Sequence, residues 1–313
     1  MKKIFLCIAG VLGAYLLAAC GKPKPVDPHA DDVKVLIDES FRPIFEEELK
    51  CFQLDNPEAV LYPSYVSEVD AINRLLNDST RMIVVTRDLS EKERTYLTEK
   101  HQLVARSQRV ATDAVALIVH PQNVDTLISL ADVKRIVSGQ ITDWSQLRVH
   151  HRTGPLELVF DHPKSSTVRY LEDSLCGGKA MKGNLYATKS NEQVIEYVSK
   201  TPNAIGVVGV DWLRNNADST RLQFLKKVHV MSVSRSAIPE NTNSYEPYQY
   251  YIATGDYPLT RGVFMICTDP RERSIAKNFY FYVSDQKGQL VITRSSQLLP
   301  YMPVQIKSVQ ITE

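Results

Sequence analysis

Short apolar runs alternate with segments of helical spacing in the first part of the chain. Val33–Ile37 is a continuous apolar run, which is typical of a strand buried on both faces of a parallel sheet. Apolar residues then recur at helical spacing from Phe41 to Phe52, and Ser40 is a suitable N-cap for that helix. The next strands and helix starts are expected at Ala59–Tyr62, Ser67, Met82–Thr86 and Ser90. This alternation predicts a doubly wound α/β unit.

A second series of the same kind follows. Ala114–Val119 is another apolar run, and a helix is expected to open at Ser165 and to stop at Gly177-Gly178. The further elements expected here are strands at Leu156–Phe160, Ala204–Gly209 and Val263–Cys267, and helices at Glu192–Val198 and Ile275–Val283. The pattern therefore predicts two α/β units in one chain.

The first 32 residues carry a different pattern. Lys2 and Lys3 precede an uncharged apolar run of 16 residues, Ile4–Ala19, which is short for a membrane span and typical of a secretory signal. The tetrad Leu17-Ala18-Ala19-Cys20 matches a lipobox, so we expect residues 1–19 to be cleaved and Cys20 to carry a diacylglyceryl group, with palmitate among its acyl chains. The alternative is an ordinary signal peptide that happens to contain a cysteine. Residues 20–32, rich in proline, are expected to form a tether to the membrane.

Composition and charge exclude several classes of protein. The 313 residues are 43% hydrophobic and 23% charged, which excludes a disordered chain and a polytopic membrane protein. A net charge of +1 lacks the basic excess of a nucleic-acid-binding domain. Beyond the signal and Cys20, only Cys51, Cys176 and Cys267 remain, so one disulfide is permitted but three thiols are the simpler interpretation.

Hydroxyl side chains recur where predicted strands end and helices begin. A helix N-terminus carries unpaired N–H groups and a partial positive charge, so several of them converging with hydroxyl groups can hold an oxyanion. In open α/β sheets such turns lie at the ligand-binding edge. Each serine could also be a simple N-cap. The candidate binding residues are Ser40, Phe41, Ser67, Thr86, Arg87, Ser165, Ser166 and Thr167.

Several segments in order resemble phosphate-binding periplasmic proteins, the solute-binding subunits of phosphate ABC importers. They are TDAVALIVHPQN (112–123), LADVKRIVSGQITDWSQL (130–147), SSTVRYLED (165–173), TPNAIGVVGVDWL (201–213), YPLTRGVFMI (257–266) and FYFYVSDQKGQLVI (279–292). The resemblance covers nearly all of residues 33–303 and implies the type 2 periplasmic-binding-protein fold, α/β lobes joined by a two-stranded hinge. Lobe one would comprise residues 33–113 plus 256–313, and lobe two residues 114–255.

The site motifs match this family only in part. Ser165 and Thr167 match its Arg-x-x-Gly-Ser-Gly-Thr motif, but Ser166 replaces a glycine and Asp161 stands where the arginine is expected. At the end of the third strand, Thr86-Arg87 replaces the family's Ser-Asp. Ser40-Phe41 matches the first turn, and Ser67 matches more loosely.

The arginine and the aspartate have thus exchanged places. One hypothesis is that Arg87 binds the oxyanion by charge while Asp161 accepts a ligand proton. The alternative is that Asp161 pairs with Lys164 or caps a turn, and that Arg87 pairs with Asp88 or Glu91.

The sequence gives little support for an enzymatic function. The sequence has no GxSxG, HExxH, P-loop or dinucleotide fingerprint, and His150-His151 is expected to lie on the surface, so no enzyme, cofactor or metal site is expected.

We predict a monomeric, lipid-anchored protein of the cell envelope, facing the periplasm or the cell surface. It would capture phosphate or a related oxyanion for the permease of an ABC importer. The alternative is a surface lipoprotein that uses the same fold for sensing or protein interaction without transport.

Overall fold

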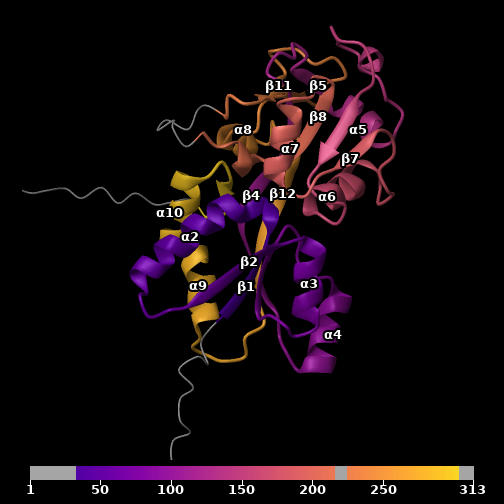
Figure 1. The fold of residues 1–313 in the computed structure, drawn as a ribbon. Helices are drawn as coiled ribbons and strands as arrows, with labels where there is room; N and C mark the ends of the chain where they lie inside the picture. Colours follow the sequence, from indigo (N-terminus) through magenta and orange to yellow (C-terminus); the bar gives the residue numbers. More distant parts are fainter. Residues whose placement is uncertain (1–32, 216–223, 303–313) are drawn as a thin grey trace, which may run out of the picture.

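The computed structural model describes residues 33–215 and 224–302, which fold into two α/β lobes on one continuous sheet (Figure 1). The predicted signal peptide, the lipidation of Cys20, the tether and the last residues assigned to lobe one lie outside the described residues. Within the described ranges, no helix combines the length and the apolar character needed to cross a membrane.

Lobe one is built on the first half of the sheet. Its strands follow the order β2–β1–β3–β12–β4, in which the first three are parallel and β12 is antiparallel to both of its neighbours. One face of the sheet is covered by α2, α9 and α10, and the other by α3 and α4, so apolar cores form on both sides. The strands are β1 (Val33–Asp38), β2 (Leu61–Val66), β3 (Met82–Val85), β4 (Arg106–Val119) and β12 (Thr260–Cys267). The helices are α2 (Arg42–Asp55), α3 (Glu68–Leu76), α4 (Glu91–His101), α9 (Ile275–Ser284) and α10 (Gln286–Ser295).

Lobe two continues the same sheet in the order β4–β8–β6–β7. Helices α5 and α6 pack on one face and α7 on the other. The principal elements are β6 (Glu157–Phe160), β7 (Leu185–Ala187), β8 (Ala204–Gly209), α5 (Leu130–Val137), α6 (Ser166–Leu175) and α7 (Asn191–Val198). The smaller ones are β5 (Leu127–Ser129), β9 (His229–Val230), β10 (Ser232–Ser234), β11 (Ser244–Tyr245), β13 (Leu299–Pro300) and α8 (Gln249–Thr254). Single 3₁₀ turns form at η1 (Glu39–Phe41), η2 (Trp144–Gln146) and η3 (Val210–Leu213).

Strand β4 belongs to both lobes. It pairs with β12 in lobe one and with β8 in lobe two, and Figure 1 shows β4 and β12 where the lobes meet. The expected boundary between residues 113 and 114 therefore falls inside a strand. The chain crosses between the lobes there and again before β12, and the exact lobe boundaries remain a prediction.

Three local expectations were wrong in detail. Ser40 is not the N-cap of α2, because Asp38 caps the turn η1 through the Ser40 N–H and α2 begins only at Arg42. The strand expected from Ala59 is instead β2, displaced toward its C-terminus by its pairing with β1. Strand β4 begins eight residues before Ala114, because ladder bonds to β12 hold a polar segment in extended form.

Candidate functional site

The strand ends of the two lobes meet at one place. Ser40 follows β1 in lobe one, and Ser166 begins α6 in lobe two, yet their Oγ atoms lie 3.3 Å apart. Both side chains are buried. The structure therefore brings together hydroxyl groups that are 126 positions apart in the sequence.

An arginine that the sequence patterns did not single out completes this cluster. Arg261 in β12 donates from Nε to Asp113 Oδ2 at 2.7 Å and from Nη1 to Ser166 Oγ at 2.9 Å. Its guanidinium lies over the Phe41 ring, 5.7 Å from the centroid. The side chain is only 2% exposed, and its Nη2 is buried with no hydrogen-bond partner among the described residues. A buried cationic donor without a partner marks a place where an anion can bind.

Asp38 presents a second unpartnered atom beside it. Its Oδ1 accepts the Ser40 N–H at 2.9 Å, while Oδ2 is buried and bonds to no other group in the described ranges. Burial raises the pKa of Asp38 to about 7, and the nearby Glu68 carboxylate adds to this, although Arg261 opposes it. Asp38 can therefore gain or lose a proton near neutral pH.

The predicted residues of the α6 turn form a closed hydrogen-bond chain. Thr167 donates from Oγ1 to Asp161 Oδ1 at 2.7 Å, and its Oγ1 lies 2.8 Å from Ser165 Oγ. Ser165 Oγ accepts the Val168 N–H at 3.3 Å and so caps α6. Asp161 also accepts from Asn191 at 3.4 Å, so its partners differ from the Lys164 considered from the sequence.

Asn191, at the start of α7, is a second contact between the lobes. Its Nδ2 donates to Glu39 Oε2 at 2.5 Å, and its Oδ1 accepts from the Gly209 N–H at 3.2 Å. Burial raises the pKa of Glu39 to about 7, which the Asn191 hydrogen bond only partly offsets. The edge of the site thus holds another carboxyl group that titrates near neutrality.

Arg87 lies in a different environment from the one expected. Its Nη1 and Nη2 donate to the two carboxylate oxygens of Glu93 at 2.8 and 2.7 Å. This bidentate bond, more than any other contact, lowers the pKa of Glu93 to about 2. Glu93 in turn belongs to the capping box of α4 with Ser90. Arg87 is therefore committed to the start of α4, as the alternative interpretation required, although with Glu93 rather than Asp88 or Glu91 as its ion-pair partner.

The remaining predicted residues are Ser67 and Thr86, of which Ser67 lines a cavity between the lobes. Ser67 accepts from the Asp70 N–H and caps α3, and Thr86 Oγ1 donates to Glu68 Oε2 at 2.5 Å. A cavity of about 160 Å³ opens here between the lobes. Its lining includes Asp38, Glu39, Ser67, Asp70, Asp161, His162, Ser165 and Lys189. The ligand-binding roles of all the predicted residues remain predictions.

Comparison with known proteins identifies the family. A sequence profile described as PBP superfamily domain matches residues 22–286. The chain belongs to the PBP superfamily.

Several proteins are similar to this PBP-superfamily chain over most of its length. It is 25% identical over 307 residues to the phosphate-binding protein PstS of Borreliella burgdorferi, covering 93% of this chain and 96% of that protein. Two solved structures share its fold. A putative phosphate ABC transporter substrate-binding protein from Clostridium perfringens has a TM-score of 0.71 at 18% identity, covering 87% of this chain and all of that one. An ABC-type phosphate transport receptor from Vibrio cholerae has a TM-score of 0.62 at 19% identity, covering 86% and 100%.

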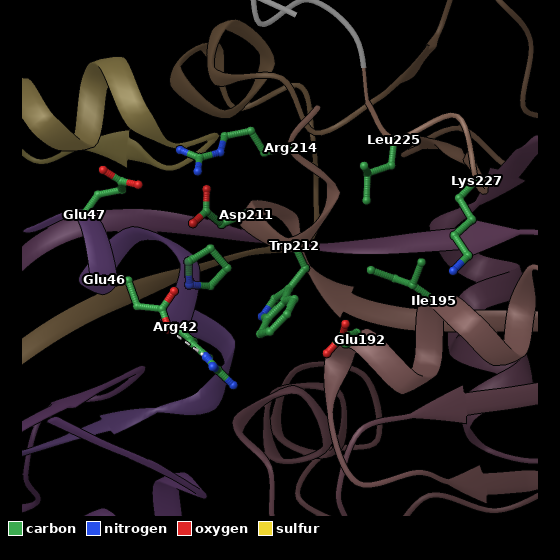
Figure 2. Close-up of a pocket in the computed structure, with 11 residues that line it drawn as sticks. Arg42, Glu46, Glu47, Glu192, Ile195, Asp211, Trp212, Arg214, Leu225 and Lys227 are labelled. Atoms are coloured by element: carbon green, nitrogen blue, oxygen red, sulfur yellow. Dashed lines mark hydrogen bonds and ion pairs between the residues drawn. The ribbon is translucent and has the colours of Figure 1, made fainter. Parts of the chain in front are cut away.

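This PBP-superfamily chain also has a larger groove beside the strand ends. It measures about 530 Å³ and lies between α2, α7 and η3, with the Trp212 indole between residues of the two lobes (Figure 2). All three of its cationic side chains already have partners. Arg42 pairs with Glu46 and Lys227 with Glu196, while Arg214 donates to the Ser295 carbonyl. We therefore favour the junction of β1, α6 and β12 as the anion site, because Arg261 Nη2 is buried there without a partner among the described residues. The smaller cavity reaches this junction at Asp38, which lines it.

One sequence signal could have revealed the missed arginine. Arg261 and Asp113 each interrupt a strongly apolar segment, and the register pairs them directly across β12 and β4. Charged residues are almost never fully buried unless they are paired. An arginine and an aspartate within two buried strands thus indicate an ion pair inside the sheet.

Proposed function

We propose that this protein is an extracytoplasmic, lipid-anchored solute-binding protein that captures phosphate, or a related oxyanion, for an ABC importer. The decisive observation is a pair of buried atoms at the junction of the lobes, Arg261 Nη2 and Asp38 Oδ2, that have no partner in the part of the chain that the structure describes. The names of its relatives support the ligand: the Borreliella protein is called phosphate-binding, and the Clostridium structure contains bound phosphate.

The site supplies complementary groups for such an anion. Arg261 provides a desolvated positive charge, and the Ser40 and Ser166 hydroxyls lie beside it. The N-terminus of α6 adds backbone N–H groups and its dipole. Together these groups can hold a tetrahedral oxyanion through charge-assisted hydrogen bonds.

The carboxyl groups favour an anion that carries a proton. Asp38, Glu39 and Asp161 all line the cavity, so a fully deprotonated oxyanion would meet their repulsion. A protonated phosphate can instead donate a hydrogen bond to a carboxylate, which sulfate cannot do at neutral pH. We therefore expect phosphate to be preferred over sulfate.

The rest of the proposal concerns the protein's setting. The protein would act as a monomer outside the cytoplasm, held to the membrane through Cys20. Its lobes would close over the anion and present it to permease subunits, with the ligand favouring the closed form. In this proposal it is a receptor and not an enzyme. The competing function is a sensing or interaction module without transport.

Calorimetry of the full-length protein in detergent, unfolded and refolded to remove carried-over ligand, tests this proposal. We expect phosphate to bind at micromolar concentration or tighter and sulfate to bind more weakly. No heat with phosphate, confirmed by an unchanged melting temperature, would favour the sensing or interaction module.

Two variants test whether Arg261 or Arg87 binds the anion. Replacing Arg261→Gln together with Asp113→Asn removes the buried ion pair without leaving a lone charge, and phosphate binding should be lost. The matched control, Arg87→Gln, should bind like the unchanged protein because Arg87 is held by Glu93. The reverse pattern, in proteins of unchanged circular dichroism, would assign the anion to Arg87.

A further inference from the structure

Arg169 joins the two lobes at a point beside the anion site. It lies in the first turn of α6 in lobe two, and its Nε donates to Glu68 Oε1 in lobe one. Its Nη2 donates to Thr86 Oγ1 at 2.7 Å, also in lobe one. The third nitrogen, Nη1, bonds to Asp173 on α6 itself at 2.8 Å. Two of its three nitrogens thus cross between the lobes.

Glu68 depends on this contact for its charge. The carboxylate, at the start of α3, has only 1% of its side chain exposed. It accepts the Thr86 N–H at 2.7 Å and the Thr86 hydroxyl at 2.5 Å. Burial raises its pKa, but Arg169 and the Thr86 hydrogen bonds outweigh burial, so the net effect lowers the pKa of Glu68. Glu68 is therefore ionised at neutral pH and needs a counter-charge.

Opening of the lobes would break this pair. Arg169 moves with α6, whereas Glu68 and Thr86 stay with α3 and β3. Arg169 is 28% exposed and keeps Asp173 as a partner, so the separated arginine loses little. Glu68 would keep only bonds from Thr86, and an unpaired carboxylate in this position is unfavourable. The closed arrangement is thus stabilised by a contact made wholly of protein groups.

We propose that Arg169 is a positioning residue that holds the lobes closed through its ion pair with Glu68 and its hydrogen bond to Thr86. This interlobe ion pair, defined by Arg169 and Glu68, acts on the equilibrium between open and closed forms and touches no ligand. It biases the protein toward the closed form before any anion binds. It also slows release, because a bound anion leaves only when the lobes part. The release part rests on the proposed function; the bias toward closure does not.

Trp212 provides a readout of closure that needs no ligand. Its indole lies between α2 of lobe one and α7 of lobe two, with Arg42 on one side and Glu192 on the other (Figure 2). The second tryptophan, Trp144, is fully buried within lobe two. Opening should therefore expose Trp212, but not Trp144, to an aqueous quencher.

The experiment compares Arg169→Ala with Arg135→Ala in the full-length protein in detergent. Arg135 is the matched control because its ion pair, with Asp132 at 3.0 Å, stays within lobe two. Without phosphate, Arg169→Ala should make Trp212 more accessible to acrylamide, and Arg135→Ala should not. In a chase experiment, Arg169→Ala should also release phosphate about tenfold faster, equivalent to about 1.4 kcal/mol.

A second variant guards against misfolding. Glu68→Gln keeps the shape of the side chain and removes its charge, so it should also increase the quenching of Trp212. This variant decides the proposal if Arg169→Ala does not fold. Equal quenching in the unchanged protein, Arg169→Ala and Glu68→Gln would overturn the proposal. A protein that binds no phosphate would refute the proposed function, and the quenching comparison would still decide the role of Arg169.

Discussion

At the scale of single residues, three buried carboxyl groups differ in what surrounds their unpartnered oxygens. Asp38 lines the cavity between the lobes, and Asp211 lines the groove around Trp212. Glu48 lies on the apolar face of α2, and neither of its oxygens has a partner within the described residues. Of these three, Asp38 is the one near the Arg261 guanidinium, whose Nη2 has no partner within the described residues. Burial raises the pKa of all three carboxyl groups, so each costs free energy of folding where it is ionised. Glu48 is the one of the three that lines neither the cavity nor the groove.

Replacing Glu48→Gln should make the protein more stable at pH 8. Burial raises the pKa of Glu48 well above its usual 4.5, so the folded state binds a proton that the unfolded state releases. Stability of the unchanged protein should therefore fall as the pH rises above 4.5. The amide of glutamine is neutral at both pH values, so the variant avoids this cost, which is about 1.4 kcal/mol for each unit by which the pKa is raised. Urea unfolding at pH 5 and pH 8 measures this, and equal pH dependence in both proteins would contradict it.

Phosphate affinity should fall between pH 6 and pH 8. Asp38 and Glu39, whose pKa values burial raises to about 7, both become ionised over this interval. Monohydrogen phosphate has one proton and can donate it to one carboxylate, so the other carboxylate repels the anion. Phosphate itself also ionises near neutrality, so the comparison must include Asp38→Asn. This variant should lose part of the pH dependence in calorimetric titrations. An identical dependence would show that Asp38 does not face the anion.

The sequence revealed the local part of the site and not its long-range part. The hydroxyls of Ser40 and Ser166 were predictable because a serine between a strand and a helix is a local pattern. The contact of Arg261 with Ser166 depends on the register of β12 against β4 and on closure of the lobes. The Arg87 side chain pairs with Glu93, six positions away. Local propensity does not predict which acidic residue an arginine pairs with.

At the scale of elements, apolar runs located the buried strands well and the paired polar strands poorly. The runs at β1, β3 and β8 have every or nearly every residue buried, so hydrophobicity alone marks them. The first part of β4 is polar and is held by pairing with β12, which no local pattern reports. Helix α10 was missed because it follows α9 directly, at Asp285, without a loop between them.

Strand β8 should tolerate no side chain at Gly206. A Cβ there would lie 2.7 Å from both Ile118 and Val198, closer than atoms pack. Gly206→Ala should therefore push α7 from the sheet and destabilise the protein by about 1–3 kcal/mol. Urea unfolding measures the loss. An unchanged midpoint would mean that α7 can shift without loss of packing.

At the scale of the whole molecule, closure brings together groups from both lobes, so ligand binding and stability should be linked. Phosphate at about 100 times its Kd should stabilise the protein by about 2.7 kcal/mol. The double variant Arg261→Gln with Asp113→Asn should lose this stabilisation, and Arg87→Gln should keep it. Differential scanning calorimetry with and without phosphate measures both. Equal stabilisation of all three proteins would place the anion elsewhere.

The course of β1 has a mechanical consequence. Val33 begins this strand and Asp38, which lines the cavity, ends it. Parallel ladders to β2 and β3 flank β1, and β12 separates β3 from β4, the strand shared with lobe two. A pull on Val33 would load these ladders in shear, along the whole strand at once. Lobe one would then be the fixed arm under tension, and lobe two, with no strand bonded to β1, the arm that swings.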